Sequence, residues 1–214
     1  LTYWCLFACS GIEIHFKRAT SEFLKSRGVH IEFQPQLFAE RNEENRTWLM
    51  GQHPYVPICV ADVNELDKDT VHNLVDGNRH CLLPQTDAFS GGVPCTSRTT
   101  LNKHFRKPVN RVQERREETG LAFYAQERSL IKHSPLILSN ECSAGLFTKS
   151  DENTDSDAEY MNKVHRREGY WAFSQAVQSV EWGSPADRYR GYWAAARGIK
   201  GDVLKVNEFF HSIH

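Results

Sequence analysis

The feature that most constrains the fold of this chain is an alternation between short apolar runs and segments with a helical pattern. The predicted strands are Tyr3–Ala8, Gln36–Ala39, Pro57–Val60, Gln85–Phe89, Leu136–Ser139, Trp171–Val180 and Tyr192–Ala196. The predicted helices are Glu13–Ser26, Asn42–Met50, Glu65–Val75, Gln113–His133 (interrupted near Gly120) and Tyr160–Arg167. This order predicts an α/β fold with a mostly parallel sheet covered by helices on both faces.

Length and composition favour one well-packed domain spanning residues 1–214, with 40% hydrophobic residues. No apolar run approaches the roughly 20 residues that cross a bilayer, so no membrane contact is expected. The start, Leu1-Thr-Tyr-Trp, is not a signal peptide, and the chain reads as an excised domain or a fragment. Its six cysteines show no Cys-x-x-Cys pairing. That spacing argues against a metal site and a disulfide framework, and it favours an intracellular location, the nucleus in a eukaryote.

The charge balance is poor for a protein that binds nucleic acid alone. The net charge is −1, whereas such proteins carry a basic footprint. Basic residues do gather locally, after position 95 and near the end of the chain: Arg98, Lys103, His104, Arg106, Lys107, Arg111, Arg188, Arg190 and Arg197. A binding surface is therefore either local or completed by a further domain or partner.

Cys95 is the first candidate for chemistry. It follows Gly91-Gly92-Val93-Pro94, at the carboxyl end of a predicted strand, where α/β sheets bind ligands. Pro94 fixes its own φ and restricts the backbone before the cysteine. The segment by itself fits a nucleophile and a buried structural thiol about equally well.

Six segments, in order, resemble motifs of the cytosine-5 DNA methyltransferases. Gly92-Val-Pro-Cys95 resembles that family's nucleophile motif, Gly-Phe-Pro-Cys-Gln-x-Phe-Ser. The others are Leu6 to Glu13, Phe38-Ala-Glu-Arg41, Ala61-Asp-Val63, Pro135 to Leu146, and Gly169-Tyr170 with Trp182 to Arg190. The resemblance covers nearly all of the chain and implies a Rossmann-like methyltransferase fold ending in a reversed strand pair. We expect the family's target-recognition domain and final cofactor motif to lie outside this sequence, because Gly198–His214 is too short for either.

The resemblance also implies a site for S-adenosylmethionine. Small residues let the backbone approach a ligand closely, as in the loop with Phe7, Ala8, Ser10 and Gly11. Glu40, after the second predicted strand, is expected to hold the ribose hydroxyls, and a surface glutamate is the alternative. Asp62 is expected to accept from the adenine amino group, and a helix N-cap is the alternative.

The catalytic residues implied are Cys95, Glu141, Arg188 and Arg190. Cys95 is expected to add to carbon-6 of cytosine as a thiolate, which makes carbon-5 nucleophilic. Glu141 is expected to bond or protonate ring N3. Arg188 and Arg190, two residues apart, share a face of an extended segment and are expected to hold the cytosine carbonyl oxygen and the active-site carboxylate. The alternative interpretation is that Arg188 and Arg190 form ion pairs on a strand that faces solvent.

The sequence departs from the family at residues that support the reactive groups. Cys9 and Ile12 replace glycines of the first loop, Thr96 stands where the family has Gln, Cys142 where it has Asn, and Ala186 where it has Gln. Cys142 is most simply a core thiol. The leading interpretation is a methyltransferase acting on DNA, with RNA cytosine as an alternative substrate. A non-catalytic module that binds the cofactor or nucleic acid is the alternative from another class.

Overall fold

The computed structural model describes residues 1–8, 11–77, 79–94, 112–113, 117–149, 154–182 and 189–198. Its strands are β1 (Thr2–Leu6), β2 (Gln34–Ala39), β3 (Ile58–Val60), β4 (Thr70–Asn73), β5 (Arg79–Leu82), β6 (Ala88–Gly92), β7 (Ile137–Ser143), β8 (Trp171–Gln178) and β9 (Tyr189–Ala196). Its α-helices are α1 (Ile12–Ser26), α2 (Glu43–Gln52), α3 (Glu117–His133) and α4 (Asp157–Arg167). Short 3-10 helices are η1 (Val63–Glu65), η3 (Ala144–Phe147) and η4 (Ser179–Trp182). None of the described helices has the length and apolar character needed to cross a membrane.

The large sheet has seven strands in the order β3-β2-β1-β6-β7-β9-β8. The neighbours from β3 to β7 run parallel, whereas β9 runs antiparallel to both β7 and β8. The predicted α/β fold, with a mostly parallel sheet and a reversed terminal strand pair, is therefore confirmed. The parallel strands all end at one edge of the sheet, which we call the carboxyl edge.

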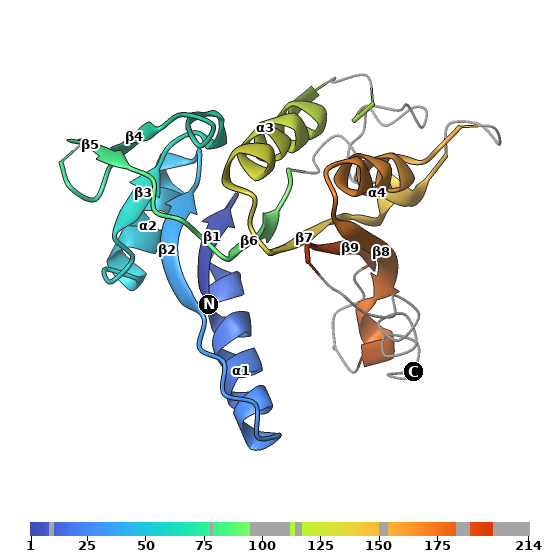
Figure 1. Ribbon diagram of the computed structural model, residues 1–214, viewed down its shortest axis with the longest axis horizontal. Helices are drawn as coiled ribbons and strands as arrows, with labels where there is room; N and C mark the ends of the chain where they lie inside the picture. Colours follow the sequence, from blue (N-terminus) through green and yellow to red (C-terminus); the bar gives the residue numbers. More distant parts are fainter. Residues whose placement is uncertain are drawn as a thin grey trace.

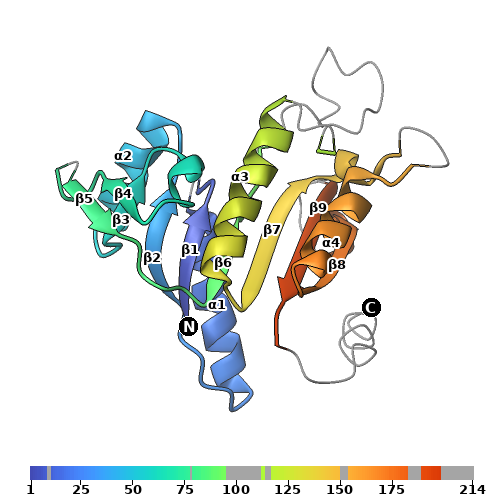
Figure 2. The same ribbon diagram turned by 45° about the horizontal axis from the view of Figure 1, so that its top comes forward.

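Helices cover both faces of this sheet (Figures 1 and 2). Successive residues of β1 point to opposite faces, as in any strand, so two separate cores form. Trp4 and Leu6 pack in the core that includes Phe123 of α3. Tyr3 and Cys5 pack in the other core, with residues from α1 and α2. Because both faces are buried, the strands read as apolar runs and not as an alternating pattern.

The predicted helix Glu65–Val75 is wrong. The structure has η1 there, followed by an antiparallel hairpin of β4 and β5. Val71 is buried while its neighbours in β4 are exposed, which is the two-residue period of a strand. Asn73 fixes the hairpin to β3, since its side chain accepts from the Cys59 N–H at 3.1 Å and donates to the Pro57 carbonyl at 2.9 Å.

Helices α3 and α4 also differ from the prediction. Gly120 does not interrupt α3, which runs continuously from Glu117 to His133. Helix α4 begins at Asp157, three residues before the predicted start, because Ser156 and Glu159 form a capping box. The spacing of these two residues is a sequence signal that could have placed this boundary.

At the centre of the sheet, β1 and β6 approach each other closely at Gly91. Gly91 pairs with Leu6, and a methyl group on Gly91 would lie 1.8 Å from the Leu6 carbonyl oxygen. Backbone atoms cannot yield to such a contact as a flexible side chain can. Glycine at this position is therefore required by the packing of two strands.

Replacing Gly91 with alanine should lower the free energy of unfolding by about 3 kcal/mol, the upper part of the usual range for overpacking. Gly51→Ala is a matched control, because Gly51 lies in α2 with open space around it. That control should leave stability unchanged or raise it by up to about 1 kcal/mol. Denaturant unfolding measures both, and a Gly91→Ala protein as stable as the wild type would contradict the packing argument.

Candidate functional site

The loop after β1 lies at the carboxyl edge and is held in a tight turn. Phe7 has a positive φ of 56°, uncommon outside glycine. The Ala8 N–H donates to the Ala39 carbonyl of β2 at 3.1 Å, and the Gly11 N–H donates back to the Ala8 carbonyl at 2.7 Å. Three of the loop residues predicted from the motif, Phe7, Ala8 and Gly11, thus lie together, while Ser10 lies outside the described residues.

Gly11 is the N-cap of α1 and packs against His53, a residue for which the sequence carried no signal. Gly11 has a φ of 66°, and a methyl group on it would lie 2.8 Å from Leu49 Cδ2 and 3.2 Å from His53 Nε2. His53 is only 5% exposed, and its Nδ1 lies 3.1 Å from the Tyr55 hydroxyl. Burial, with a smaller effect of the nearby His15, lowers the pKa of His53 from its ordinary value. The His53 ring therefore closes the back of the loop.

Glu40 follows β2 directly and is nearly buried, with 9% of its surface exposed. Its Oε1 accepts from the Asn42 N–H at 2.8 Å, and its backbone N–H donates to the Val60 carbonyl at 3.1 Å. The carboxylate is therefore fixed at the carboxyl edge, next to the loop that follows β1.

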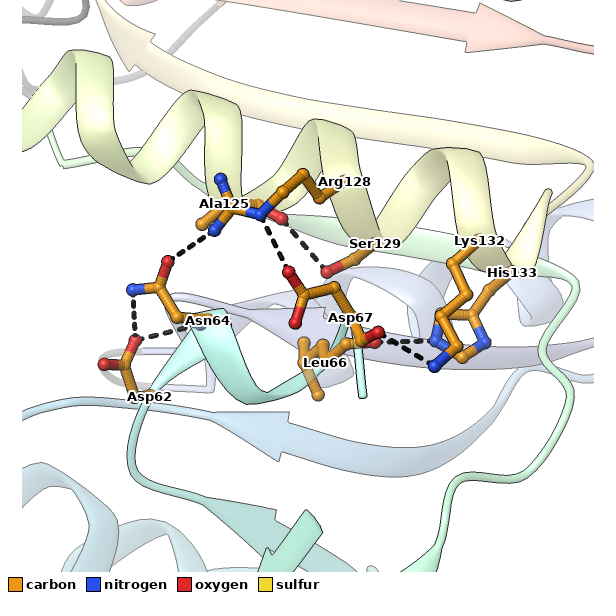
Figure 3. Close-up of polar contacts among 9 residues, drawn as sticks. All are labelled: Asp62, Asn64, Leu66, Asp67, Ala125, Arg128, Ser129, Lys132 and His133. Atoms are coloured by element: carbon orange, nitrogen blue, oxygen red, sulfur yellow. Dashed lines mark hydrogen bonds and ion pairs between the residues drawn. The ribbon is translucent and has the colours of Figure 1, made fainter. Parts of the chain in front are cut away.

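Asp62 follows β3 and is the N-cap of η1 (Figure 3). Its Oδ1 accepts from the Asn64 backbone N–H at 2.9 Å and from the Asn64 side chain at 2.8 Å. The capping role weighed in the sequence analysis is thus present. Its Oδ1 makes both of these bonds, so capping and recognition of a ligand are compatible on one carboxylate.

Glu141 lies in β7 and pairs with Arg190 of β9. The distance from Arg190 Nε to Glu141 Oε1 is 2.9 Å, and both side chains are partly exposed. Across the neighbouring strand Gly92 is in register with Glu141, and a methyl group on Gly92 would lie 3.3 Å from Glu141 Oε2. The glycine thus leaves room for the carboxylate.

The segment that leads to Cys95 starts beside Glu141. After Gly92 come Val93 and Pro94, and the Pro94 carbonyl accepts from the Thr119 hydroxyl of α3 at 2.6 Å. Cys95 and Arg188 lie outside the described residues, so their positions stay predictions. The neighbouring ends of β6 and β7 are the part of that arrangement that the structure contains.

Solved structures with a similar fold are methyltransferases. One is a DNA modification methyltransferase encoded in an E. coli prophage, with a TM-score of 0.61 and 17% identity, covering 95% of this chain and 49% of that one. Another is the S. pombe Dnmt2 methyltransferase, with a TM-score of 0.61 and 16% identity, covering 98% and 54%. A mutant of Spodoptera frugiperda DNMT2 has a TM-score of 0.61 and 13% identity, covering 95% and 52%.

The chain has a Rossmann-like methyltransferase fold. The resemblance inferred from the motifs is thereby confirmed for the fold. The chain spans about half the length of these solved structures. No protein-family model matches the sequence, and no curated protein matches it either.

Within this methyltransferase fold, Glu13 is a second residue whose position the sequence analysis did not interpret. It lies in the first turn of α1, with its Oε2 3.7 Å from Cys5 Sγ. Burial raises the pKa of Glu13 above its ordinary value, and the charge of Glu141 raises it further, whereas hydrogen bonds from the backbone and Cys5 oppose the increase.

A buried polar cluster supports β7 from the other face of the sheet. The side chains of Gln126 and Asn140 are linked by hydrogen bonds of 3.0 and 3.2 Å. In the swapped orientation of its amide, which satisfies more of the surrounding groups, Asn140 instead accepts from Gln126 Nε2 at 2.9 Å and from Trp193 Nε1 at 3.1 Å. Asn140 directly precedes Glu141, so this cluster ties the strand that carries the carboxylate to α3 and β9. Cys142 on the same face is a fully buried core residue, as expected.

Gln126→Met or Asn140→Leu alone should destabilise the protein by about 1–3 kcal/mol, because the remaining amide is left buried without its partner. The double variant should lose less than the sum of the two, since it removes both polar groups at once. Denaturant unfolding of all four proteins forms a double-mutant cycle. Strictly additive losses would contradict a coupled pair.

Proposed function

We propose that this chain is the catalytic part of a methyltransferase that transfers a methyl group from S-adenosylmethionine to carbon-5 of cytosine in DNA. The observation that carries the proposal is the pair Glu141–Arg190, which lies beside the end of β6 where the Val93-Pro94-Cys95 segment begins. The fold, shared with solved methyltransferases, supports the same reaction class.

The residues at the ends of β1, β2 and β3 fit the proposed cofactor. The hydrogen bond from the Gly11 N–H to the Ala8 carbonyl brings the end of β1 close to the start of α1, and the small residues Ala8 and Gly11 leave room there for a ligand. Glu40 and Asp62 place two carboxylates at adjacent strand ends, suited to the ribose hydroxyls and the adenine amino group. S-adenosylmethionine bound there supplies an electrophilic methyl group.

The protein's own residues activate the cytosine. The Cys95 thiolate forms a bond to carbon-6, and the ring electrons displaced toward N3 make carbon-5 nucleophilic. Glu141 gives a proton to N3, where negative charge would otherwise develop, while Arg190 holds the Glu141 carboxyl group in place. Carbon-5 bonds to the methyl group as the bond between that methyl group and the sulfonium of the cofactor breaks. A water molecule then takes the carbon-5 proton, and the electron pair of that bond re-forms the ring double bond and expels the Cys95 thiolate. The target base must leave the duplex stack to reach this edge.

Two observations bear on alternatives. The net charge is −1, which favours a further domain or partner for substrate binding. Cys142 occupies the position of a supporting Asn in the family and is buried in the core, which favours a weakly active or binding-only module. Substrate choice between DNA and RNA is left to experiment, with DNA as the proposal.

Trapping on 5-fluorocytosine tests the reaction, because fluorine at carbon-5 cannot leave as a proton and the adduct persists. We expect a covalent adduct at Cys95 that depends on S-adenosylmethionine, in low salt with DNA. Cys95→Ser should lower methyl transfer about a thousandfold or more, because a hydroxyl is a far weaker nucleophile than a thiolate. Cys81→Ser, on the remote β5, is the matched control and should keep full activity.

An RNA oligonucleotide of the same sequence separates the two substrates. An adduct with RNA alone would overturn the assignment to DNA but keep the chemistry. Tight cofactor binding with no adduct on either substrate would favour the binding module.

Removal of either carboxylate should weaken cofactor binding. We expect Glu40→Ala and Asp62→Ala each to raise the dissociation constant for S-adenosylhomocysteine about tenfold or more, the loss of roughly one charge-assisted hydrogen bond. Glu44→Ala, an exposed glutamate in the first turn of α2, is the control and should bind normally. Calorimetry measures the dissociation constant of the wild type and the three variants. Equal affinities would show that Glu40 and Asp62 do not belong to the cofactor site.

A further inference from the structure

Asp62 is not an isolated carboxylate at the end of β3. Asn64 donates to one of its oxygens twice, once from the backbone and once from the side chain. The Asn64 side-chain oxygen then accepts from Arg128 Nη2 of α3 at 2.7 Å. The three side chains form a chain of hydrogen bonds that starts on α3 and ends at the expected adenine acceptor (Figure 3).

Arg128 can hold two groups at once because its guanidinium is a planar fork. While Nη2 donates to Asn64, Nε lies 2.8 Å from Asp67 Oδ2. Arg128 therefore binds the segment that follows β3 at two residues, Asn64 and Asp67. A lysine at this position could keep an ion pair with Asp67 but could not reproduce the fork.

Lys132 holds the same segment one helical turn further along α3 without touching Asn64. Its Nζ donates to the Asp67 carbonyl at 2.8 Å and to Asp69 Oδ1 at 2.7 Å. Arg128 and Lys132 thus both bind the segment that follows β3. Of the two, only Arg128 has a hydrogen bond to Asn64 in the described structure. This difference makes Lys132 a matched control (Figure 3).

We propose that Arg128 is a positioning residue for recognition of the adenine amino group, acting through Asn64 on the Asp62 carboxylate. The inference rests on the proposed function, because it needs a ligand with an adenine ring at the end of β3. A carboxylate with one oxygen held by Asn64 presents its other oxygen in a restricted direction. Loss of Arg128 frees Asn64, and the acceptor then has to be ordered when the ligand binds.

The test compares S-adenosylhomocysteine with S-inosylhomocysteine, in which an oxygen replaces the amino group. A site built to accept from an amino group discriminates against a ligand that lacks the donor. In the wild type we expect tighter binding of the adenine ligand. Arg128→Met should weaken that ligand about tenfold and the inosine ligand less than about twofold, so that discrimination is mostly lost.

Three further proteins complete the experiment. Lys132→Met should leave the ratio of the two dissociation constants unchanged, and Arg128→Lys should behave like Arg128→Met. In an Asp62→Ala background, Arg128→Met should have no additional effect on the ratio. Thermal unfolding checks that all variants fold, which is expected because the Arg128 side chain is half exposed.

The outcomes separate the two hypotheses. If Arg128→Met weakens both ligands equally, or keeps the wild-type ratio, Arg128 has no positioning role although the cofactor site stands. If Lys132→Met changes the ratio as much as Arg128→Met does, general anchoring of the segment explains the effect and the specific inference is wrong. If the wild type binds neither ligand, the proposed function fails, and this inference fails with it.

Discussion

The close approach of β1 and β6 at Gly91 is the constraint on which the rest of the structure depends. These two strands lie at the centre of the sheet, and no side chain fits between Gly91 and the Leu6 carbonyl. One strand leads into the small-residue loop and the other into the Val93-Pro94-Cys95 segment. The contact therefore sets the spacing between the proposed methyl donor and the proposed nucleophile. A stacked pair, Trp4 and Phe89 with ring centroids 5.1 Å apart, reinforces the same two strands from one face.

Helix α3 connects the parts of the site that the sheet holds side by side. Thr119 near its start contacts the Pro94 carbonyl, Gln126 contacts Asn140 next to Glu141, and Arg128 reaches Asn64 and Asp67. These contacts span about three turns of one helix that covers one face of the sheet. A change in the tilt of α3 would therefore shift its contacts with the nucleophile segment, with β7 and with the segment after β3 together. The proposed catalytic and cofactor residues thus share one rigid support.

The general fold could be predicted from the sequence because its signals are local. Apolar runs buried on both faces and helical repeats identify the elements, and their alternation leads to a parallel sheet. The prediction of a helix over Glu65–Val75 was wrong because the apolar residues there have a spacing compatible with a helix, although Thr70–Asn73 is a strand. There, burial of Val71 and the anchoring of Asn73 to Cys59 and Pro57 decide in favour of a strand. Such anchors involve residues distant in sequence, so no local pattern reports them.

The sequence by itself determined the order of the chemical groups along the chain: a small-residue loop, Glu40, Asp62, the Pro94-Cys95 pair, Glu141 and Arg190, each near an apolar run. Parallel strands then bring their carboxyl ends to one edge, which is why this order is informative. Only the tertiary structure decided how the groups are held. The pairing of Arg190 with Glu141, the packing of His53 on Gly11 and the reach of Arg128 to Asn64 join residues from different elements. Those contacts depend on strand register and helix placement, which follow from the packing of the whole core and not from any one segment.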